Sequence, residues 1–221
     1  MTVFQFLDYA GVAVFAATGA LAASRKQLDI IGFLFFACFT GVGGGTVRDV
    51  LLDRNPVFWI DNANYLAVCV ATAILLYWFA PMVDQRYRLL LWLDAAGIAA
   101  YSVMGAHIGL EVSGSAPVAI GMGILTATFG GIMRDIMSGE PSVILRKELY
   151  VTAALAGAAL YVFMVSAGVE EALSACLAVV IAFVIRGCAI QFSWTLPGYR
   201  HRLGRVVKQA PQDGDSPDNR V

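Results

Sequence analysis

Two short stretches of this sequence combine glycines with an arginine and an aspartate inside an apolar run. The first, TGVGGGTVRDVLL, runs from Thr40 to Leu52, and the second, TATFGGIMRDIMS, runs from Thr126 to Ser138. Ionisable side chains within a membrane span are energetically costly, and they commonly mark an ion or substrate pathway. We therefore take as candidate pathway residues the glycines and charged residues of both stretches: Gly43, Gly44, Gly45, Arg48, Asp49, Gly130, Gly131, Arg134 and Asp135.

The elements that must hold these residues are membrane-spanning helices. Of the 221 residues, 59% are hydrophobic and 14% are charged, whereas soluble domains carry about a quarter charged residues. A spanning helix needs roughly 20 apolar residues. Seven segments meet this requirement, at about 6–24, 29–52, 64–81, 89–110, 117–138, 148–168 and 171–192. We predict a single transmembrane domain over residues 1–197 and a basic, then disordered, cytoplasmic tail over residues 198–221.

The basic residues predict the orientation of these spans. An odd number of spans places the two termini on opposite faces of the membrane. Most of the arginines and lysines of the loops fall on the face that also carries the C-terminus, among them Arg25, Lys26, Arg86 and Arg88. Because cytoplasmic loops are enriched in basic residues, we expect the N-terminus outside and the C-terminus in the cytoplasm.

The two glycine-containing stretches belong to a longer internal repeat. Shifted by 86 positions, Leu7–Leu52 aligns without a gap on Leu93–Ser138. Each copy contains three spans, about residues 5–81 and 89–168, so the second copy enters the membrane from the opposite face. We predict an all-α polytopic membrane protein made of two inverted three-helix units and a seventh helix at about 171–192. Inverted repeats with discontinuous helices recur in transport proteins.

The glycine clusters of the second and fifth spans predict a kink or break in each helix. Glycine accepts unusual backbone dihedrals, and freed backbone groups are tolerated in a membrane only where they face protein or a water-filled cavity. The clusters therefore favour kinks beside a polar path. Close helix packing is the alternative, because Gly41 and Gly45 also form a G-x-x-x-G spacing.

The inverted topology predicts a partner for each arginine. Asp8 begins the first span at the face where Arg48 ends the second, and Asp94 and Arg134 are related in the same way at the opposite face. We predict the ion pairs Asp8–Arg48 and Asp94–Arg134, one near each mouth of the path.

Two further expectations concern the neighbours of these charges. Adjacent residues of a helix do not face each other, so Asp49 and Asp135 should not share a helix face with the arginines that precede them. We expect one member of each Arg-Asp couple to point into the path and the other to tie helices together. Thr40 and Thr126 are possible path-lining residues, although back-bonding to their own helices is the commoner fate of threonine. An alternative role for the charged residues is to hold helices together without contacting any ion.

The doubled signature GGTVRD and GGIMRD in spans 2 and 5 of a seven-span inverted repeat resembles the prokaryotic trimeric intracellular cation (TRIC) channels, a domain family also described as glycine transporters. The resemblance covers about residues 5–192. It implies a homotrimer in a prokaryotic cell (inner) membrane, in which each protomer has its own pore for K⁺ or Na⁺ beside the glycines of spans 2 and 5. It implies no cofactor and no tightly bound metal.

Three functions remain open at this point. The first and favoured function is a monovalent cation channel. The second is a secondary transporter of a small solute such as glycine, because transporters use the same architecture. A membrane scaffold without transport requires both Arg-Asp insertions to be purely structural. An enzyme is not indicated, because His107 and His201 are the only histidines and no nucleophile or metal-ligand spacing occurs. The net charge of −1 gives no argument for nucleic acid, so the expected partners are the lipid bilayer and further copies of the chain.

Overall fold

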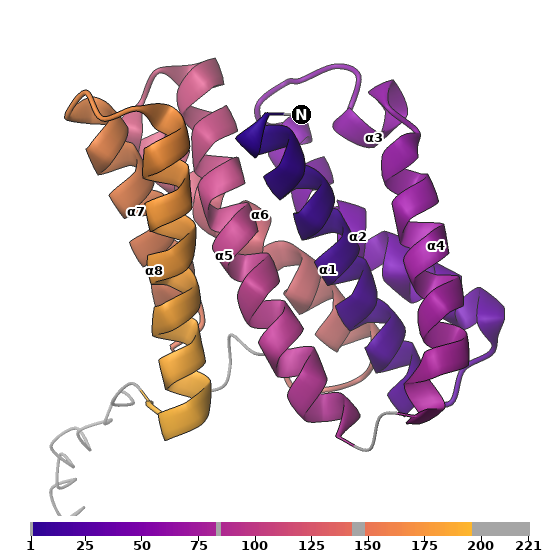
Figure 1. Ribbon diagram of the computed structural model, residues 1–221. Coiled ribbons are helices and arrows are strands. Elements are labelled where there is room, and N and C mark those ends of the chain that lie inside the picture. Colours follow the sequence, from indigo (N-terminus) through magenta and orange to yellow (C-terminus); the bar gives the residue numbers. More distant parts are fainter. Residues whose placement is uncertain (1, 83–84, 143–148, 196–221) are drawn as a thin grey trace, which may run out of the picture.

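The computed structural model describes residues 2–82, 85–142 and 149–195, and these residues form a bundle of long helices (Figure 1). The predicted tail at 198–221 lies outside the described residues. The helices are α1 (Val3–Arg25), α2 (Ile30–Leu51), the short α3 (Phe58–Asp61), α4 (Asn64–Phe79), α5 (Arg86–Ser113), α6 (Ala116–Met137), α7 (Val151–Ser166) and α8 (Glu171–Phe192), with a 3₁₀ turn, Ala80–Met82, after α4.

Local sequence signals set several helix ends. Thr2 and Gln5 form a capping box at the start of α1, in which each side chain bonds to the backbone of the other residue. The Asp29 carboxylate accepts a hydrogen bond of 2.8 Å from the Gly32 backbone and caps α2. Helix α5 stops at Gly114, whose φ of 62° is readily adopted only without a side chain.

Within the described residues, six helices are long and apolar enough to cross a membrane: α1, α2, α4 with its 3₁₀ turn, α5, α6 and α8. The sixth predicted span, 148–168, corresponds to α7, which is apolar but has only 16 residues. Its predicted beginning falls on residues 143–148, which lie outside the described residues. The all-helical fold expected from the sequence is confirmed.

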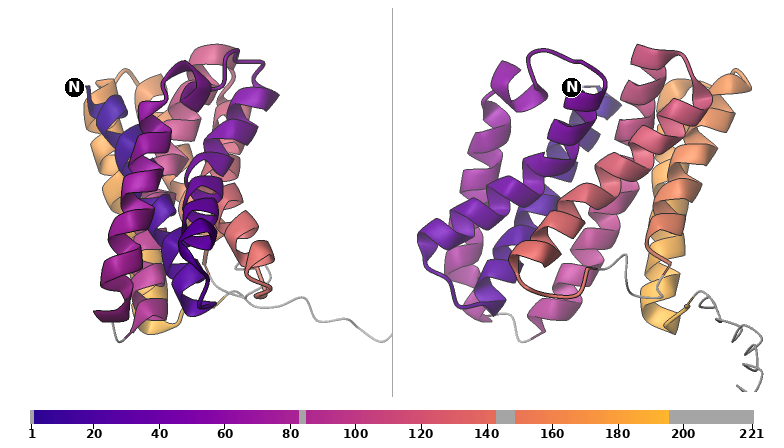
Figure 2. Two further views of the ribbon diagram at one scale, coloured as in Figure 1. Left: turned by 90° about the vertical axis from the view of Figure 1, so that its right-hand side faces the viewer. Right: turned by 180° about the vertical axis from the view of Figure 1, so that it is seen from behind.

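The long helices pack in an order that the repeat explains. Helices α1 and α5, the first helix of each unit, are the most buried and contact each other at the centre of the bundle. Helices α2 and α6 pack against them and against one another on one face, visible from behind in Figure 2. Helix α4 covers one flank, and α7 with α8 covers the other (Figure 1).

Equivalent glycines make equivalent contacts in the two units. A Cβ atom on Gly19 would collide with the backbone carbonyl of Phe36 and would lie 2.7 Å from the hydroxyl of Thr40. A Cβ atom on Gly105 would lie 2.7 Å from the carbonyl oxygen of Met122 and 2.6 Å from the hydroxyl of Thr126. These positions are related by the same shift of 86 residues, so the repeat is a repeat of packing as well as of sequence.

The helical backbone is unbroken across both glycine clusters. Helix α2 is continuous from Ile30 to Leu51 and α6 from Ala116 to Met137. The helix break that the glycine clusters could have produced is therefore absent from α2 and α6, because the helical backbone continues through the glycines. A bend of the helix axis without a break stays a prediction.

Candidate functional site

The carboxyl-terminal turn of α6 holds a buried cluster of three charged residues, here called the Arg134 cluster: Asp94, Arg134 and Asp135. The Arg134 Nη1 atom lies 2.8 Å from Asp94 Oδ1, and Nη2 lies 2.9 Å from Asp135 Oδ1. The Nε atom of Arg134 also donates to Asp135 Oδ1 at 3.0 Å. Arg134 is 1% exposed, so this guanidinium is neutralised by two carboxylates inside the bundle.

The carboxyl-terminal turn of α2 holds the equivalent Arg48 cluster, defined as Asp8, Arg48, Asp49, Arg54 and Tyr65. The Nε atom of Arg48 donates to Asp49 Oδ1 at 2.8 Å, and Arg54 Nη1 lies 3.4 Å from the same oxygen. Asp8 accepts a 2.7 Å hydrogen bond on Oδ2 from the Tyr65 hydroxyl. No hydrogen bond joins Asp8 to Arg48.

The ion-pair hypothesis is thus realised at one end of the molecule and not at the other. Asp94 and Arg134 are in direct contact, as the inverted topology predicts. Asp8 and Arg48 line one cavity without bonding, because Tyr65 bonds to one oxygen of Asp8 and Asp49 holds Arg48 through Nε.

Asp49 and Asp135 bond to their neighbouring arginines although adjacent residues do not share a helix face. Each accepts a hydrogen bond from the Nε atom of the arginine that precedes it. Adjacent Cβ atoms diverge on a helix, but the arginine side chain is long enough to fold back to the next carboxylate. Asp49 also accepts a 2.9 Å bond on Oδ2 from the Phe58 backbone, which ties the start of α3 to the end of α2.

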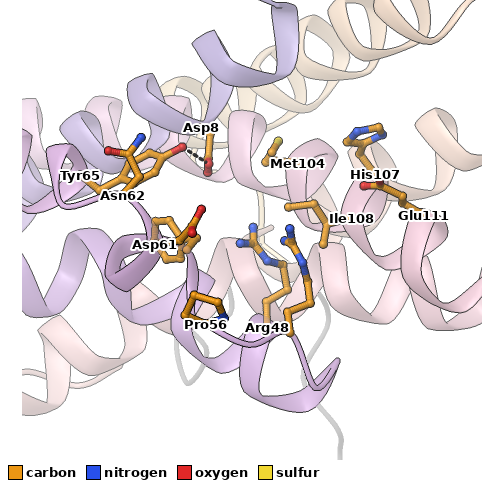
Figure 3. Close-up of a pocket in the computed structure, with 12 residues that line it drawn as sticks. Asp8, Arg48, Pro56, Asp61, Asn62, Tyr65, Met104, His107, Ile108 and Glu111 are labelled. Carbon is orange, nitrogen blue, oxygen red and sulfur yellow. Dashed lines mark hydrogen bonds between the residues drawn. The ribbon is translucent and has the colours of Figure 1, made fainter.

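A cavity of about 270 Å³ lies at the Arg48 cluster (Figure 3). Figure 3 shows the Asp8 carboxylate and the Arg48 guanidinium directed toward it from α1 and α2, with His107 and Glu111 on α5 at its far side. Asp61 and Asn62 contribute from the segment between α2 and α4. The remaining lining residues are Arg54, Pro56, Phe58, Tyr65, Met104 and Ile108.

Among the described residues, the Arg134 cluster has little free space beside it. The pocket beside Arg134 and Asp135 has a volume of about 10 Å³, which admits no more than about one water molecule. Arg25, at the end of α1, closes it further through a contact of 3.0 Å with Glu140, just beyond α6. Within the described part of the chain, the two clusters therefore differ in the free space beside them although their sequences are related.

Helices α2 and α6 cross between the two clusters at the candidate glycines. Gly44 lies against the carbonyl oxygen of Thr126, and a Cβ atom on Gly130 would lie 2.6 Å from the carbonyl oxygen of Thr40. These two glycines therefore allow α2 and α6 to pack closely, which is the alternative to a kink that the sequence left open. Gly43 has nothing within 4 Å of its Cβ position.

The other two candidate glycines lie beside aromatic side chains. A Cβ atom on Gly45 would lie 2.6 Å from the Phe58 ring, and one on Gly131 would lie 3.3 Å from Asp94 Oδ1 and would collide with the Tyr150 hydroxyl. Gly45 therefore gives Phe58 room beside Arg48, whose guanidinium carbon lies 5.5 Å above that ring.

The two candidate threonines have different surroundings. The Thr126 hydroxyl donates to the Met122 carbonyl at 2.6 Å, which is the back-bonding considered from the sequence. The Thr40 hydroxyl is buried and has no hydrogen-bond partner among the described residues.

Sequence reasoning missed two tyrosines that belong to the charged clusters. Tyr65 bonds to Asp8, and the fully buried Tyr150 lies beside Gly131 and over Arg186, whose guanidinium carbon is 5.3 Å from the ring. Beyond Leu52, a shift of 85 positions in place of 86 aligns Tyr65 with Tyr150. This extension of the repeat would have indicated a shared role for the two tyrosines.

These features define a polytopic helical membrane protein with inverted repeats and a buried charged cluster toward each end of the bundle. The sequence pattern of the family described as glycine transporter matches residues 5–81 and matches again at residues 91–166. The chain belongs to this family, and the double match agrees with the internal repeat.

Named relatives and solved structures agree with this assignment. The chain is 36% identical over 197 residues to a UPF0126 membrane protein of Vibrio cholerae, covering 87% of this chain and 81% of the relative. It is 35% identical over 201 residues to the UPF0126 inner membrane protein YadS of Escherichia coli K12, covering 88% and 95%. A multi-pass membrane protein is therefore indicated by the relatives as well as by the helices.

The solved structures are TRIC channels. The TRIC trimeric intracellular cation channel orthologue from Rhodobacter sphaeroides is 44% identical, with a TM-score of 0.86 over 88% of this chain and 100% of that chain. A prokaryotic TRIC channel crystallised in 0.5 M KCl is 27% identical, with a TM-score of 0.81 over 88% and 98%. The resemblance to this family is confirmed, and these relatives are membrane transport proteins rather than enzymes.

Proposed function

We propose that the protein is a monovalent cation channel that conducts K⁺ and Na⁺ through a pore within each protomer, between the two inverted repeats. The observation that carries this proposal is the likeness to the Rhodobacter sphaeroides channel, at 44% identity and a TM-score of 0.86 over that whole chain. The glycine and Arg-Asp positions also fall within the segments that match the family pattern.

The proposed path runs along α2 and α6 from the Arg48 cluster to the Arg134 cluster. Its open mouth is the cavity of about 270 Å³, which contains Asp8, Asp61 and Glu111. Carboxylates attract cations, and the adjacent Asp49 offsets the charge of Arg48. The path then passes the crossing of α2 and α6, where the Thr40 hydroxyl is a candidate ligand for a partly dehydrated ion.

The Arg134 cluster is the proposed constriction. Its arginine is bound by Asp94 and Asp135, and the neighbouring pocket is too small for a hydrated ion. Ions pass only if Arg134 and the surrounding helix ends move. No cofactor or tightly bound metal is needed for this function, and the charge of each arginine is offset by the protein itself.

We further propose a homotrimer in a prokaryotic cell membrane, with the Arg48 end outside. We infer the trimer from the Rhodobacter sphaeroides relative, which is a trimeric channel. The orientation follows the basic residues Arg25, Arg86 and Arg88, which lie at the Arg134 end, because basic loops favour the cytoplasm.

A carrier for a small solute is the second candidate, and the unequal space beside the two clusters favours it. A polar cavity at one cluster and little free space at the other fit a protein that exposes its site to one side of the membrane at a time, and the family description names glycine transport. A scaffold without transport is disfavoured, because a polar cavity lined by charged groups is unnecessary for helix packing alone.

Single-channel recording from purified protein in a planar bilayer under a KCl gradient separates these functions. A channel gives unitary currents that reverse near the K⁺ equilibrium potential. The variants Asp49→Asn and Asp135→Asn should alter the unitary conductance, because each removes a carboxylate beside the path. Bilayers without unitary currents, together with concentrative glycine uptake into proteoliposomes, would replace the channel by the carrier.

A further inference from the structure

Two buried charged groups around the cavity at the Arg48 cluster have atoms without partners. Arg48 is 1% exposed, yet its Nη1 and Nη2 atoms have no hydrogen-bond partner among the described residues. Asp8 is 6% exposed, and its Oδ1 atom is also unpartnered within that part of the chain. Buried polar atoms nearly always have partners, and a buried charge without one is especially costly. These atoms indicate a ligand.

The geometry of Arg48 selects the chemistry of one ligand group. Its Nε atom is bound to Asp49 at 2.8 Å, which fixes the guanidinium from the side of its own helix. The two remaining nitrogens are left for the cavity (Figure 3). A planar pair of N–H donors binds a carboxylate through two parallel hydrogen bonds, so Arg48 is suited to a carboxylate more than to a single-atom ion.

The other charges of the cavity select a second ligand group. Asp8, Asp61 and Glu111 line the same space together with Arg54. The three carboxylates outnumber the two arginines of the cavity and repel a simple anion at short range. A ligand that also carries a cationic group avoids this repulsion. An ammonium group supplies the hydrogen-bond donors that the free Oδ1 atom of Asp8 lacks.

We propose that this cavity binds a small zwitterionic solute of the α-amino acid class, with its carboxylate on Arg48 and its ammonium group on Asp8. The volume of about 270 Å³ lies below the range of about 300–1,000 Å³ typical of sites for drug-sized ligands, which restricts the solute to a small one. The Arg134 cluster does not repeat the site, because Asp94 and Asp135 already bind the Nη atoms of its arginine.

Binding is tested by isothermal titration of the purified full chain in lipid nanodiscs. The probes are glycine, which carries both charges, and acetate and methylammonium, which each carry one. We expect saturable binding of glycine, with acetate and methylammonium each at least about tenfold weaker, because each lacks one charge-assisted interaction. The measurement needs no ion flux, so a failure of the proposed conduction would leave its result intact.

Three variants locate the site. Asp8→Asn and Arg48→Lys should each weaken glycine binding at least about tenfold, since one removes the carboxylate charge and the other the planar pair of donors. Glu171→Gln is the matched control, because it removes a carboxylate that does not line this cavity. It should bind glycine like the parent protein. Asp8→Asn preserves the side-chain shape, so it provides the test if Arg48→Lys does not fold.

Three outcomes would overturn the proposal. The first is no glycine binding at millimolar concentrations. The second is acetate or chloride binding as tightly as glycine, which would identify a simple anion site. The third is unchanged glycine affinity in Asp8→Asn, which would place the binding elsewhere.

Discussion

Gly44 of α2 lies against the backbone carbonyl oxygen of Thr126 in α6, so closely that no side chain fits between them. By the same repeat relationship, Gly130 of α6 faces the carbonyl oxygen of Thr40 in α2. The two helices that carry the arginine clusters therefore cross through a pair of reciprocal glycine contacts. This crossing fixes the distance between the two units at the level of the proposed path.

Replacing Gly44 by alanine should destabilise the protein. The added methyl group meets a backbone atom, which cannot rotate away, and overpacking of this kind costs about 1–3 kcal/mol. Gly43→Ala is the matched control, because its methyl group enters open space and alanine favours the helix. Thermal unfolding in detergent should show a lower midpoint for Gly44→Ala and an equal or higher one for Gly43→Ala. Equal midpoints would contradict the close contact.

The two aspartates that the repeat relates, Asp8 and Asp94, should differ in their effect on stability. Asp94→Asn removes a carboxylate 2.8 Å from Arg134, and breaking a buried ion pair costs about 3–5 kcal/mol. Asp8→Asn removes a carboxylate that bonds only to Tyr65 among the described side chains, so its cost should be smaller. Chemical denaturation of both variants under one detergent condition provides the comparison. A larger loss for Asp8→Asn would indicate that Asp8 and Arg48 pair directly.

Asp49→Asn should loosen the segment that connects α2 to α4. The carboxylate accepts bonds from Arg48, Arg54 and the Phe58 backbone, and an asparagine amide cannot accept all of them. Hydrogen exchange measured by mass spectrometry should increase over residues 53–62. Asp53→Asn is the control, since the Asp53 carboxylate bonds to no described side chain other than the nearby Asn55. Exchange that rises equally in both variants would exclude the anchoring role of Asp49.

The sequence predicts the arrangement of helices well because that arrangement follows from its repeat. The shift that aligns Asp8 with Asp94 and Arg48 with Arg134 also predicts the inverted topology, and it leads to the Asp94–Arg134 contact. The periodicity and spacing of residues predict the helix arrangement because they depend on which helix faces are buried.

The asymmetry of the two clusters was not predictable from the same pattern. It depends on partners outside the repeat motif, such as the Tyr65 hydroxyl that bonds to Asp8 and the Arg54 side chain that reaches Asp49. The fold-back of Arg48 onto Asp49 depends on a side-chain conformation that residue spacing does not encode. The glycines illustrate the same limit, because a cluster allows both a break and a close contact.

Thr40→Val tests whether the helix crossing is hydrated. The Thr40 hydroxyl is buried without a partner among the described residues, whereas the Thr126 hydroxyl bonds to Met122. If Thr40 lines the proposed path, water or a passing ion bonds to its hydroxyl, and valine should lower the unitary conductance and reduce stability by about 1 kcal/mol. Thr126→Val is the matched control and should conduct like the parent channel, because its hydroxyl is directed to its own helix. Unchanged conductance with a gain in stability for Thr40→Val would show that the crossing is dry and that the path lies elsewhere, since valine then removes only an unpaired hydroxyl.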